Sequence, residues 1–222
     1  MKIKTLKNYW EMGYSVSDIV EHTLTLPEPR LVLPTGSTPI AMYKEVVNRD
    51  LDWSHAVTFN LDVYLMNINH PQSYQTFMKE NLFNRINIYP DNCNFPFRPT
   101  SAFEDKISEN KGIDLCILGI GSNGHIAFNE PGSTFDSRTR VVNLDEQTIE
   151  DNSRFFDSVD DVPKQAITMG LGTIMESKKI VLMVSGEHKL NIMNVAMAGE
   201  VTESIPASIL QTHNNVEVFY SD

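Results

Sequence analysis

The side chains best suited to acid–base chemistry in this sequence are His125 and Glu130, five positions apart in a segment bounded by Gly119 and Pro131. A carboxylate beside an imidazole orients the ring and favours its protonated form, which is the usual arrangement for a proton shuttle. Asp62 directly follows an apolar run, so it is a candidate general base. A lone histidine in a loop is more often structural, and an aspartate after a strand is often a turn residue, so both alternatives stay open on these residues alone.

A second candidate site is the segment Thr35-Gly36-Ser37-Thr38-Pro39, which joins an apolar run to a segment with helical periodicity. Backbone N–H groups, hydroxyls and the helix dipole at such a junction can bind an anion. Ser37 and Thr38 are also good capping residues, so a well-capped helix is the alternative. Lys189 follows a later strand and lies in the first turn of an expected helix, where a cation opposes the dipole. A bound anion would explain that lysine.

Other chemistries fit the motifs less well. Residues 119–124 match the dinucleotide fingerprint GxGxxG, but that fingerprint needs a helix to open within it, and the Pro-Gly pair at 131–132 breaks any such helix. We therefore expect no nicotinamide or flavin cofactor. The six histidines include no HxxxH or HExxH spacing, which predicts no metal site. The sequence contains no GxSxG motif, so it gives little support to catalysis by a serine nucleophile.

Alternating strands and helices must position these groups. Near-continuous apolar runs predict strands at 30–33, 56–59, 115–118, 180–184 and 216–220, with a weaker one at 3–6. Helical periodicity covers 16–24, 39–48, 73–85, 164–176, 187–198 and 206–213. This order predicts an α/β fold, a doubly wound and mostly parallel sheet with helices on both faces. Ligands bind beyond the C-terminal ends of such strands, and the candidate groups follow four of them.

Composition narrows the class of partner. The 222 residues carry 18 Lys and Arg against 29 Asp and Glu, a net charge of −11, which argues against nucleic acid and anionic membranes. A small anion remains possible as a ligand if cations are placed locally.

The sequence also bears on location and domain number. No apolar run approaches the ~18 residues of a membrane span, and the N-terminus lacks a signal-peptide pattern. Two cysteines without CxxC spacing favour the cytoplasm. Neither 91–99 nor 143–162 resembles a linker, so we expect a single domain over residues 1–222.

At these motifs the sequence resembles the glucosamine-6-phosphate deaminase (isomerase) family. The resemblance covers nearly the whole chain, in stretches at 33–39, 59–62 with Tyr64, 70–74, 118–131, 137–140, 152–156, 162–164 and 166–168. The stretch 124–131, Gly-His-Ile-Ala-Phe-Asn-Glu-Pro, is the most specific, because the related 6-phosphogluconolactonases differ after the shared Gly-His. Val63 stands where the family commonly has Glu, and Asn123 stands where some members have Asp.

The resemblance implies a cofactor-free conversion of glucosamine 6-phosphate and water to fructose 6-phosphate and ammonia. His125 would open the sugar ring with help from Asn123 and Glu130, and Asp62 would then move a proton from C2 to C1. The alternatives are a deaminase of galactosamine 6-phosphate, which the change at Val63 keeps open, a 6-phosphogluconolactonase, and a non-catalytic sugar-phosphate sensor.

The same resemblance implies where the substrate phosphate binds. Its contacts map to Thr35, Gly36, Ser37 and Thr38, with Arg154 and Lys189 as the two cations. A mobile lid would cover roughly 143–161 and would carry Arg154. The family's larger hexameric members have an allosteric site whose residues are not all matched, so we expect no allosteric control. The chain is also shorter than those members, and we expect a monomer or a small homo-oligomer.

Overall fold

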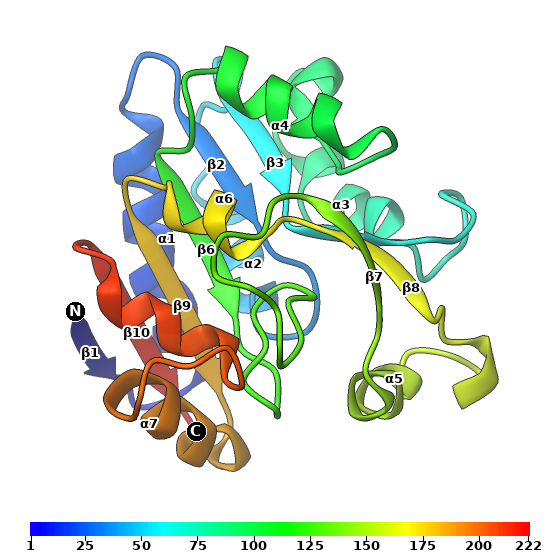
Figure 1. Cartoon of the computed structure of the whole chain (residues 1–222). Coiled ribbons are helices and arrows are strands. Elements are labelled where there is room, and N and C mark those ends of the chain that lie inside the picture. The colour runs from blue at the N-terminus through cyan, green and yellow to red at the C-terminus, as the bar shows by residue number, and fades with distance from the viewer.

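The computed structural model describes residues 1–222 and is centred on a seven-stranded parallel sheet (Figure 1). The strand order is β1-β10-β9-β6-β2-β3-β5, and every neighbouring pair runs parallel. The strands are β1 Lys2–Thr5, β2 Arg30–Leu33, β3 Val57–Asn60, β5 Cys93–Asn94, β6 Leu115–Gly119, β9 Ile180–Ser185 and β10 Val216–Ser221. The expected parallel α/β sheet is confirmed, and each expected strand is present within a residue of its predicted bounds.

Helices cover both faces of this sheet, because successive side chains of each strand point to opposite sides. Leu31 and Leu33 of β2 pack with α1 (Tyr9–Leu24), α2 (Ile40–Asn48) and α3 (Tyr74–Asn81) on one face. Val32 faces the other side, where α4 (Thr100–Glu109), α6 (Leu171–Met175), α7 (Leu190–Ala198) and the 3₁₀ segment Pro206–Thr212 pack. Two buried faces explain why the strands are apolar almost throughout.

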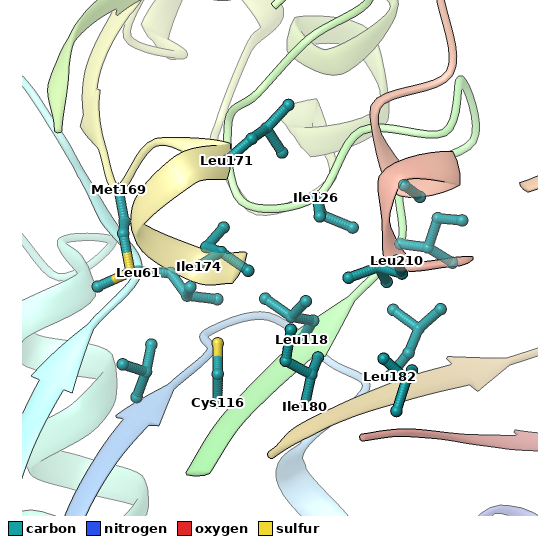
Figure 2. Packing of buried hydrophobic residues seen from close by; sticks show 14 of the residues in the cluster. Leu61, Cys116, Leu118, Ile126, Met169, Leu171, Ile174, Ile180, Leu182 and Leu210 are labelled. Atoms are coloured by element: carbon teal, nitrogen blue, oxygen red, sulfur yellow. The ribbon is translucent and has the colours of Figure 1, made fainter. Parts of the chain in front are cut away.

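Figure 2 shows the core on the second face. Leu118 of β6 and Leu182 of β9 rise from the sheet into this cluster, where Leu182 lies below Leu210 of the 3₁₀ segment and Ile174 of α6 lies on the other side of Leu118. Ile126, from the loop that follows β6, lies over the same cluster and is fully buried. Cys116 is also fully buried in this cluster. The loop carrying the candidate histidine is therefore fastened to the core one residue after that histidine.

A second, three-stranded antiparallel sheet has the order β4-β8-β7, with β4 Asp62–Tyr64, β7 Arg140–Asn143 and β8 Gln165–Thr168. Strands β7 and β8 reach outward from the body of the molecule, and α5 (Glu146–Ser153) lies at their outer end (Figure 1). We call residues 140–168 the arm. Asp145 caps α5 by accepting the N–H of Gln147. The arm contains the polar stretch that sequence patterns left without a predicted structure.

The prediction of a single helix over residues 164–176 is wrong. Residues Gln165–Thr168 form β8 between two strands, and only Leu171–Met175 are helical. The short run Ala-Ile-Thr fits a helix or a strand by spacing alone, and pairing with β4 and β7 decides between them. The short strand β5 and helix α4 were not predicted.

The other helices differ from the predictions at their ends. Helix α1 begins at Tyr9, a full two turns before the expected start, because Asn8 accepts the N–H groups of Trp10 and Glu11. The segments expected as helices over 73–85 and 187–198 each divide into an α-helix and a 3₁₀ turn, Phe83–Arg85 and Glu187–Lys189. The last expected helix is 3₁₀ throughout. No helix in the molecule is long and apolar enough to cross a membrane.

Candidate active site

Four neighbouring strands, β9, β6, β2 and β3, end at one cleft of about 850 Å³. The predicted residues that line the cleft are Thr35, Gly36, Ser37, Thr38, Asp62, His125, Arg154 and Lys189. Asn123 and Glu130 do not line the cleft but lie half-buried beside His125. Asn123 shares a hydrogen bond with the His125 ring, and the Glu130 carboxylate lies within ion-pair distance of it. The fold thus brings together side chains that are up to 154 positions apart in the sequence.

The His125 imidazole is held by two neighbours. Its Nδ1 atom lies 2.8 Å from Asn123 Oδ1 and 3.3 Å from Glu130 Oε2. The Asn123 amide donates to the same Glu130 oxygen at 2.9 Å, which closes the triangle. Because Nδ1 faces oxygen acceptors, that nitrogen carries the proton and Nε2 is the basic nitrogen of the neutral ring. We call His125, Asn123 and Glu130 the relay.

The segment between β6 and β7, residues 120–139, makes room for this ring, and we call it the glycine-rich loop. A Cβ atom on Gly121 would lie 2.1 Å from His125 Cε1, so no larger residue fits there without moving the imidazole. Gly124 has a φ of +86°, in the left-handed region that glycine occupies without strain. As expected, no helix opens within 119–124 and the chain continues as a loop. Gly121 therefore serves the close packing of the relay, and a Cβ on Gly124 would lie 2.8 Å from Ile205.

Two carboxylates at the site have opposite pKa shifts. Burial raises the pKa of Asp62 to about 7. Burial opposes ionisation of Glu130 too, but His125, Asn123 and Thr148 outweigh it and lower the pKa of Glu130 to about 2. Glu130 is therefore a fixed negative charge at neutral pH, whereas Asp62 can take up and release a proton. With pKa values this far apart, Glu130 is suited to orienting the His125 ring and Asp62 to proton transfer.

Asp62 lies where the two sheets meet. It begins β4 and pairs with Thr168 of β8, while the preceding Leu61 donates its N–H to Leu33 of β2. These bonds fix the backbone of Asp62 at the floor of the cleft. The next residue, Val63, is buried and does not line the cleft, because adjacent strand residues face opposite sides. The departure from the family pattern at Val63 therefore lies outside the cleft.

The loop of Thr35 to Thr38 leaves its polar groups available to a ligand. Helix α2 begins at Ile40 with Pro39 as its cap, and neither Ser37 nor Thr38 caps it, whereas the Ala41 N–H donates to the Tyr9 hydroxyl of α1 at 3.0 Å. The capping interpretation of Ser37 and Thr38 is therefore wrong. Gly36 has a φ of +88° and a Cβ there would meet no atom within 4 Å, so its backbone borders open space. The Tyr9 hydroxyl donates to the Ser37 carbonyl at 2.7 Å and secures the loop to α1.

Two cations stand near this loop. Lys189 is half-buried and its Nζ donates to the Ile120 carbonyl at 3.0 Å. Burial lowers the pKa of Lys189, the negative charge of Asp151 raises it, and the nearby guanidinium of Arg154 lowers it. Neither cation belongs to any of the ion pairs in the molecule. In a chain with a net charge of −11, two adjacent cations that form no ion pair indicate an anion site.

The structure also adds residues that sequence patterns did not predict. Tyr74 lines the cleft with its ring 4.6 Å from that of Tyr64, and burial, with the charges of Tyr64 and Asp62, raises the pKa of Tyr74 well above its ordinary value. Thr148 and Asp151, both on α5, reach the glycine-rich loop. Tyr74 lies in the matched stretch 70–74, which could have drawn attention to it. Nothing in the polar sequence of α5 signals its contacts.

No three His, Cys, Asp or Glu side chains gather in an arrangement that could hold a metal ion.

Comparison with known proteins identifies the family. Residues 18–219 match the family model of glucosamine-6-phosphate isomerases and 6-phosphogluconolactonases. A glucosamine-6-phosphate deaminase of Clostridium novyi is 47% identical, over 97% of this chain and 95% of that one. One from Streptococcus uberis is 46% identical, over 100% and 97%.

Solved structures agree with the fold. A monomeric glucosamine-6-phosphate deaminase superposes with a TM-score of 0.96 at 36% identity, over 100% of this chain and 97% of that one. The 6-phosphogluconolactonase of Thermotoga maritima shares the fold, with a TM-score of 0.78 at 19% identity over 100% and 99%. With a family match that spans nearly all of its residues, the chain belongs to the family of glucosamine-6-phosphate isomerases and 6-phosphogluconolactonases.

Proposed function

We propose that this protein is a glucosamine-6-phosphate deaminase, which converts glucosamine 6-phosphate and water to fructose 6-phosphate and ammonia. One observation carries the proposal: a single cleft holds a base with a pKa of about 7, an imidazole relay and an anion site. The relatives at 46–47% identity, whose names state this activity, support it. The lactonase structures share only the fold, at 19% identity for the Thermotoga protein.

The substrate phosphate would bind at the loop of Thr35 to Thr38, between Lys189 and Arg154. Backbone N–H groups and hydroxyls of the loop would donate to phosphate oxygens, and the two cations would balance its charge. This binding energy is remote from the reacting carbons. It would position C1 and C2 of the sugar against the acid–base groups without taking part in the chemistry.

His125 would open the sugar ring. Ring opening breaks the C1–O5 bond, takes a proton from the O1 hydroxyl and delivers one to O5, so one imidazole can serve both steps. The Nδ1 hydrogen bond leaves Nε2 as the exchanging nitrogen. Glu130, ionised because its pKa is about 2, would stabilise the imidazolium that forms in between.

Asp62 would then perform the isomerisation. The open aldehyde acidifies the C2 proton, which the carboxylate removes to give an enolamine. Returning that proton to C1 gives an imine at C2, to which water adds before ammonia leaves. A pKa of about 7 suits both halves, because the carboxyl is a base when ionised and an acid once it holds the proton.

The test is a side-by-side assay of ammonia release from glucosamine 6-phosphate and galactosamine 6-phosphate, with hydrolysis of 6-phosphogluconolactone measured in parallel. We expect ammonia from glucosamine 6-phosphate without added metal or cofactor. Faster release from the galactosamine compound would move the proposal to the second substrate. Lactone hydrolysis without ammonia would replace it. Binding of glucosamine 6-phosphate with no turnover of any of the three would indicate a sensor.

Three further expectations accompany this proposal: a single domain over 1–222, a monomer or small homo-oligomer, and a cytoplasmic location. Light scattering of the purified chain checks the oligomeric state. A single cooperative unfolding transition, seen alike by fluorescence and circular dichroism, would support one domain.

A further inference from the structure

Helix α5 contacts the glycine-rich loop at three points. The Asp145 N–H lies 3.5 Å from Glu130 Oε1, and Thr148 Oγ1 lies 3.4 Å from His125 Nδ1. Farther along, the Asp151 carboxylate accepts a hydrogen bond from the Ser122 hydroxyl at 2.5 Å. Asp145 is the N-cap of α5 and makes its contact through the backbone, whereas Thr148 and Asp151 lie three residues apart on the helix and so share one face. This face is the part of the arm that closes against the relay.

The bond from Ser122 is the strongest of the three by geometry and charge. Gln147, one turn earlier on α5, donates to the other Asp151 oxygen at 2.9 Å and holds the carboxylate toward the loop. Burial raises the pKa of Asp151, but the bonds from Ser122 and Gln147 and the charges of Lys189 and His125 outweigh it and lower that pKa. The carboxylate is therefore ionised, and a hydrogen bond to an ionised acceptor is stronger than one between neutral groups.

Arg154 depends on the placement of α5. It is the residue that ends the helix, three positions after Asp151, and its guanidinium rests over the Phe155 ring at 4.8 Å. It is exposed and makes no ion pair, so its own side chain does not fix it in the cleft. The attachment of α5 therefore sets where this cation stands relative to Lys189 and the loop of Thr35 to Thr38.

We propose that Asp151 is a positioning residue whose bond from Ser122 latches helix α5 to the glycine-rich loop and so seats Arg154 at the anion site. This inference rests on the proposed function of the cleft as a sugar-phosphate site. The latch acts on phosphate binding first and on the relay second, because Thr148 contacts His125 from the same helix face.

The test compares Asp151→Ala, Ser122→Ala and the double variant by steady-state kinetics. We expect Asp151→Ala to raise KM about tenfold, the loss of a charge-assisted hydrogen bond, while kcat falls by less. Ser122→Ala should act in the same direction and less strongly. The double variant should be no worse than Asp151→Ala, because both single changes break one bond. Asp151→Asn keeps an acceptor for Ser122 and should stay within about threefold of the parent.

A binding measurement separates the latch from the catalytic proposal. Trp10 lines the cleft whereas Trp53 is fully buried in the core, so tryptophan fluorescence can follow titration with inorganic phosphate. Asp151→Ala should weaken phosphate binding about tenfold. It should also speed hydrogen exchange of α5 amides, which detects a loosened helix even if fluorescence changes little. Glu150→Ala, an exposed carboxylate on the same helix, is the matched control and should change neither.

Additive effects of the two single changes would overturn the latch, as would equal behaviour of Asp151→Ala and Glu150→Ala. If the parent protein releases no ammonia but Asp151→Ala still weakens phosphate binding and loosens α5, the deaminase proposal fails and the latch stands.

Discussion

The two ends of the cleft are built in opposite ways. At the acid–base end, His125, Asn123 and Glu130 bond to one another, and Asp62 is buried on a backbone fixed between two sheets. At the anion end, Lys189 and Arg154 form no ion pair, and the hydroxyls of Ser37 and Thr38 cap no helix.

The acid–base end is therefore preorganised before the substrate binds, whereas the anion end is completed only when an anion binds. Groups that move protons must keep their geometry without the substrate, so they satisfy one another. Groups that bind an anion are completed by it, and any internal partner would compete with the ligand. Changes at the first end should therefore reduce kcat, and changes at the second should raise KM. Each of the following experiments can break that division.

Asp62→Asn should have the largest effect. An amide of the same shape cannot accept the C2 proton, so kcat should fall about a thousandfold or more while KM changes less than about threefold. Ammonia release under saturating glucosamine 6-phosphate measures this, with inorganic phosphate binding as the check on the anion end. Retained turnover would mean that another group is the base.

The same variant should be more stable than the parent above pH 7. Burial raises the pKa of Asp62 from 3.8 to about 7, so the folded state holds this proton more tightly than the unfolded chain. The stabilisation of the folded state by the protonated Asp62 carboxyl is complete below pH 4 and is lost as pH rises through 7. The parent's free energy of unfolding therefore falls by about 4 kcal/mol at most over this range. Urea unfolding should show Asp62→Asn gaining clearly more stability relative to the parent at pH 8 than at pH 5, because the loss in the parent begins near pH 4 and is complete only above pH 7. A loss at both pH values would indicate a structural role.

Glu130→Gln should lower kcat about a hundredfold, because the neutral amide cannot stabilise an imidazolium on His125. KM should stay within about threefold, since Glu130 lies behind the ring and does not line the cleft. Asp136→Asn removes an exposed carboxylate from the same loop and should leave both constants unchanged. A rise in KM with unchanged kcat would place Glu130 in binding and break the comparison.

Lys189→Ala should raise KM about twentyfold and lower kcat less than about threefold, because it removes a half-buried cation from the anion end only. Lys164→Ala, an exposed lysine of the arm outside the cleft, is the matched control. Titration with inorganic phosphate should show the same loss of affinity as KM. A fall in kcat of the size expected for Glu130→Gln would show that the two ends are not independent.

The pH dependence of kcat/KM should report Asp62. With a pKa of about 7, its ionised fraction rises from about a tenth at pH 6 to about nine tenths at pH 8, so the rate should rise about tenfold. Glu130, with a pKa of about 2, stays ionised across this range and adds no inflection. The affinity for inorganic phosphate over the same range corrects for ionisation of the phosphate. A flat corrected profile would contradict Asp62 as the base.

Sequence patterns predicted the main sheet and the residues at its strand ends well, because both faces of each strand are buried and leave unbroken apolar runs. Leu31, Val32 and Leu33 illustrate this, since they pack alternately on the two faces. The parallel order then placed Thr35, Asp62, His125 and Lys189 at one edge by topology alone.

The arm could not be predicted in the same way. Its strand β8 is four residues long and its helix α5 is polar, so neither has a period that distinguishes helix from strand. Their structure depends on partners distant in the sequence, such as the pairing of Thr168 with Asp62. For the same reason, the contacts of Thr148 and Asp151 with the glycine-rich loop had no signal in the sequence.

The smallest expected effect concerns the rim of the anion end. Lys44 lines the cleft, is exposed, and holds its ammonium 5.3 Å from the centre of the Trp10 ring. An exposed cation at the mouth attracts an anionic substrate by long-range field rather than by contact, and salt screens that field. Lys44→Gln should therefore raise KM about twofold at low ionic strength and leave it unchanged at about 0.5 M salt. Lys79→Gln, exposed and outside the cleft, should leave KM unchanged at both salt concentrations. An effect of Lys44→Gln that persists in high salt would mean that Lys44 contacts the phosphate directly, and the anion end would then extend to α2 beyond its first turn.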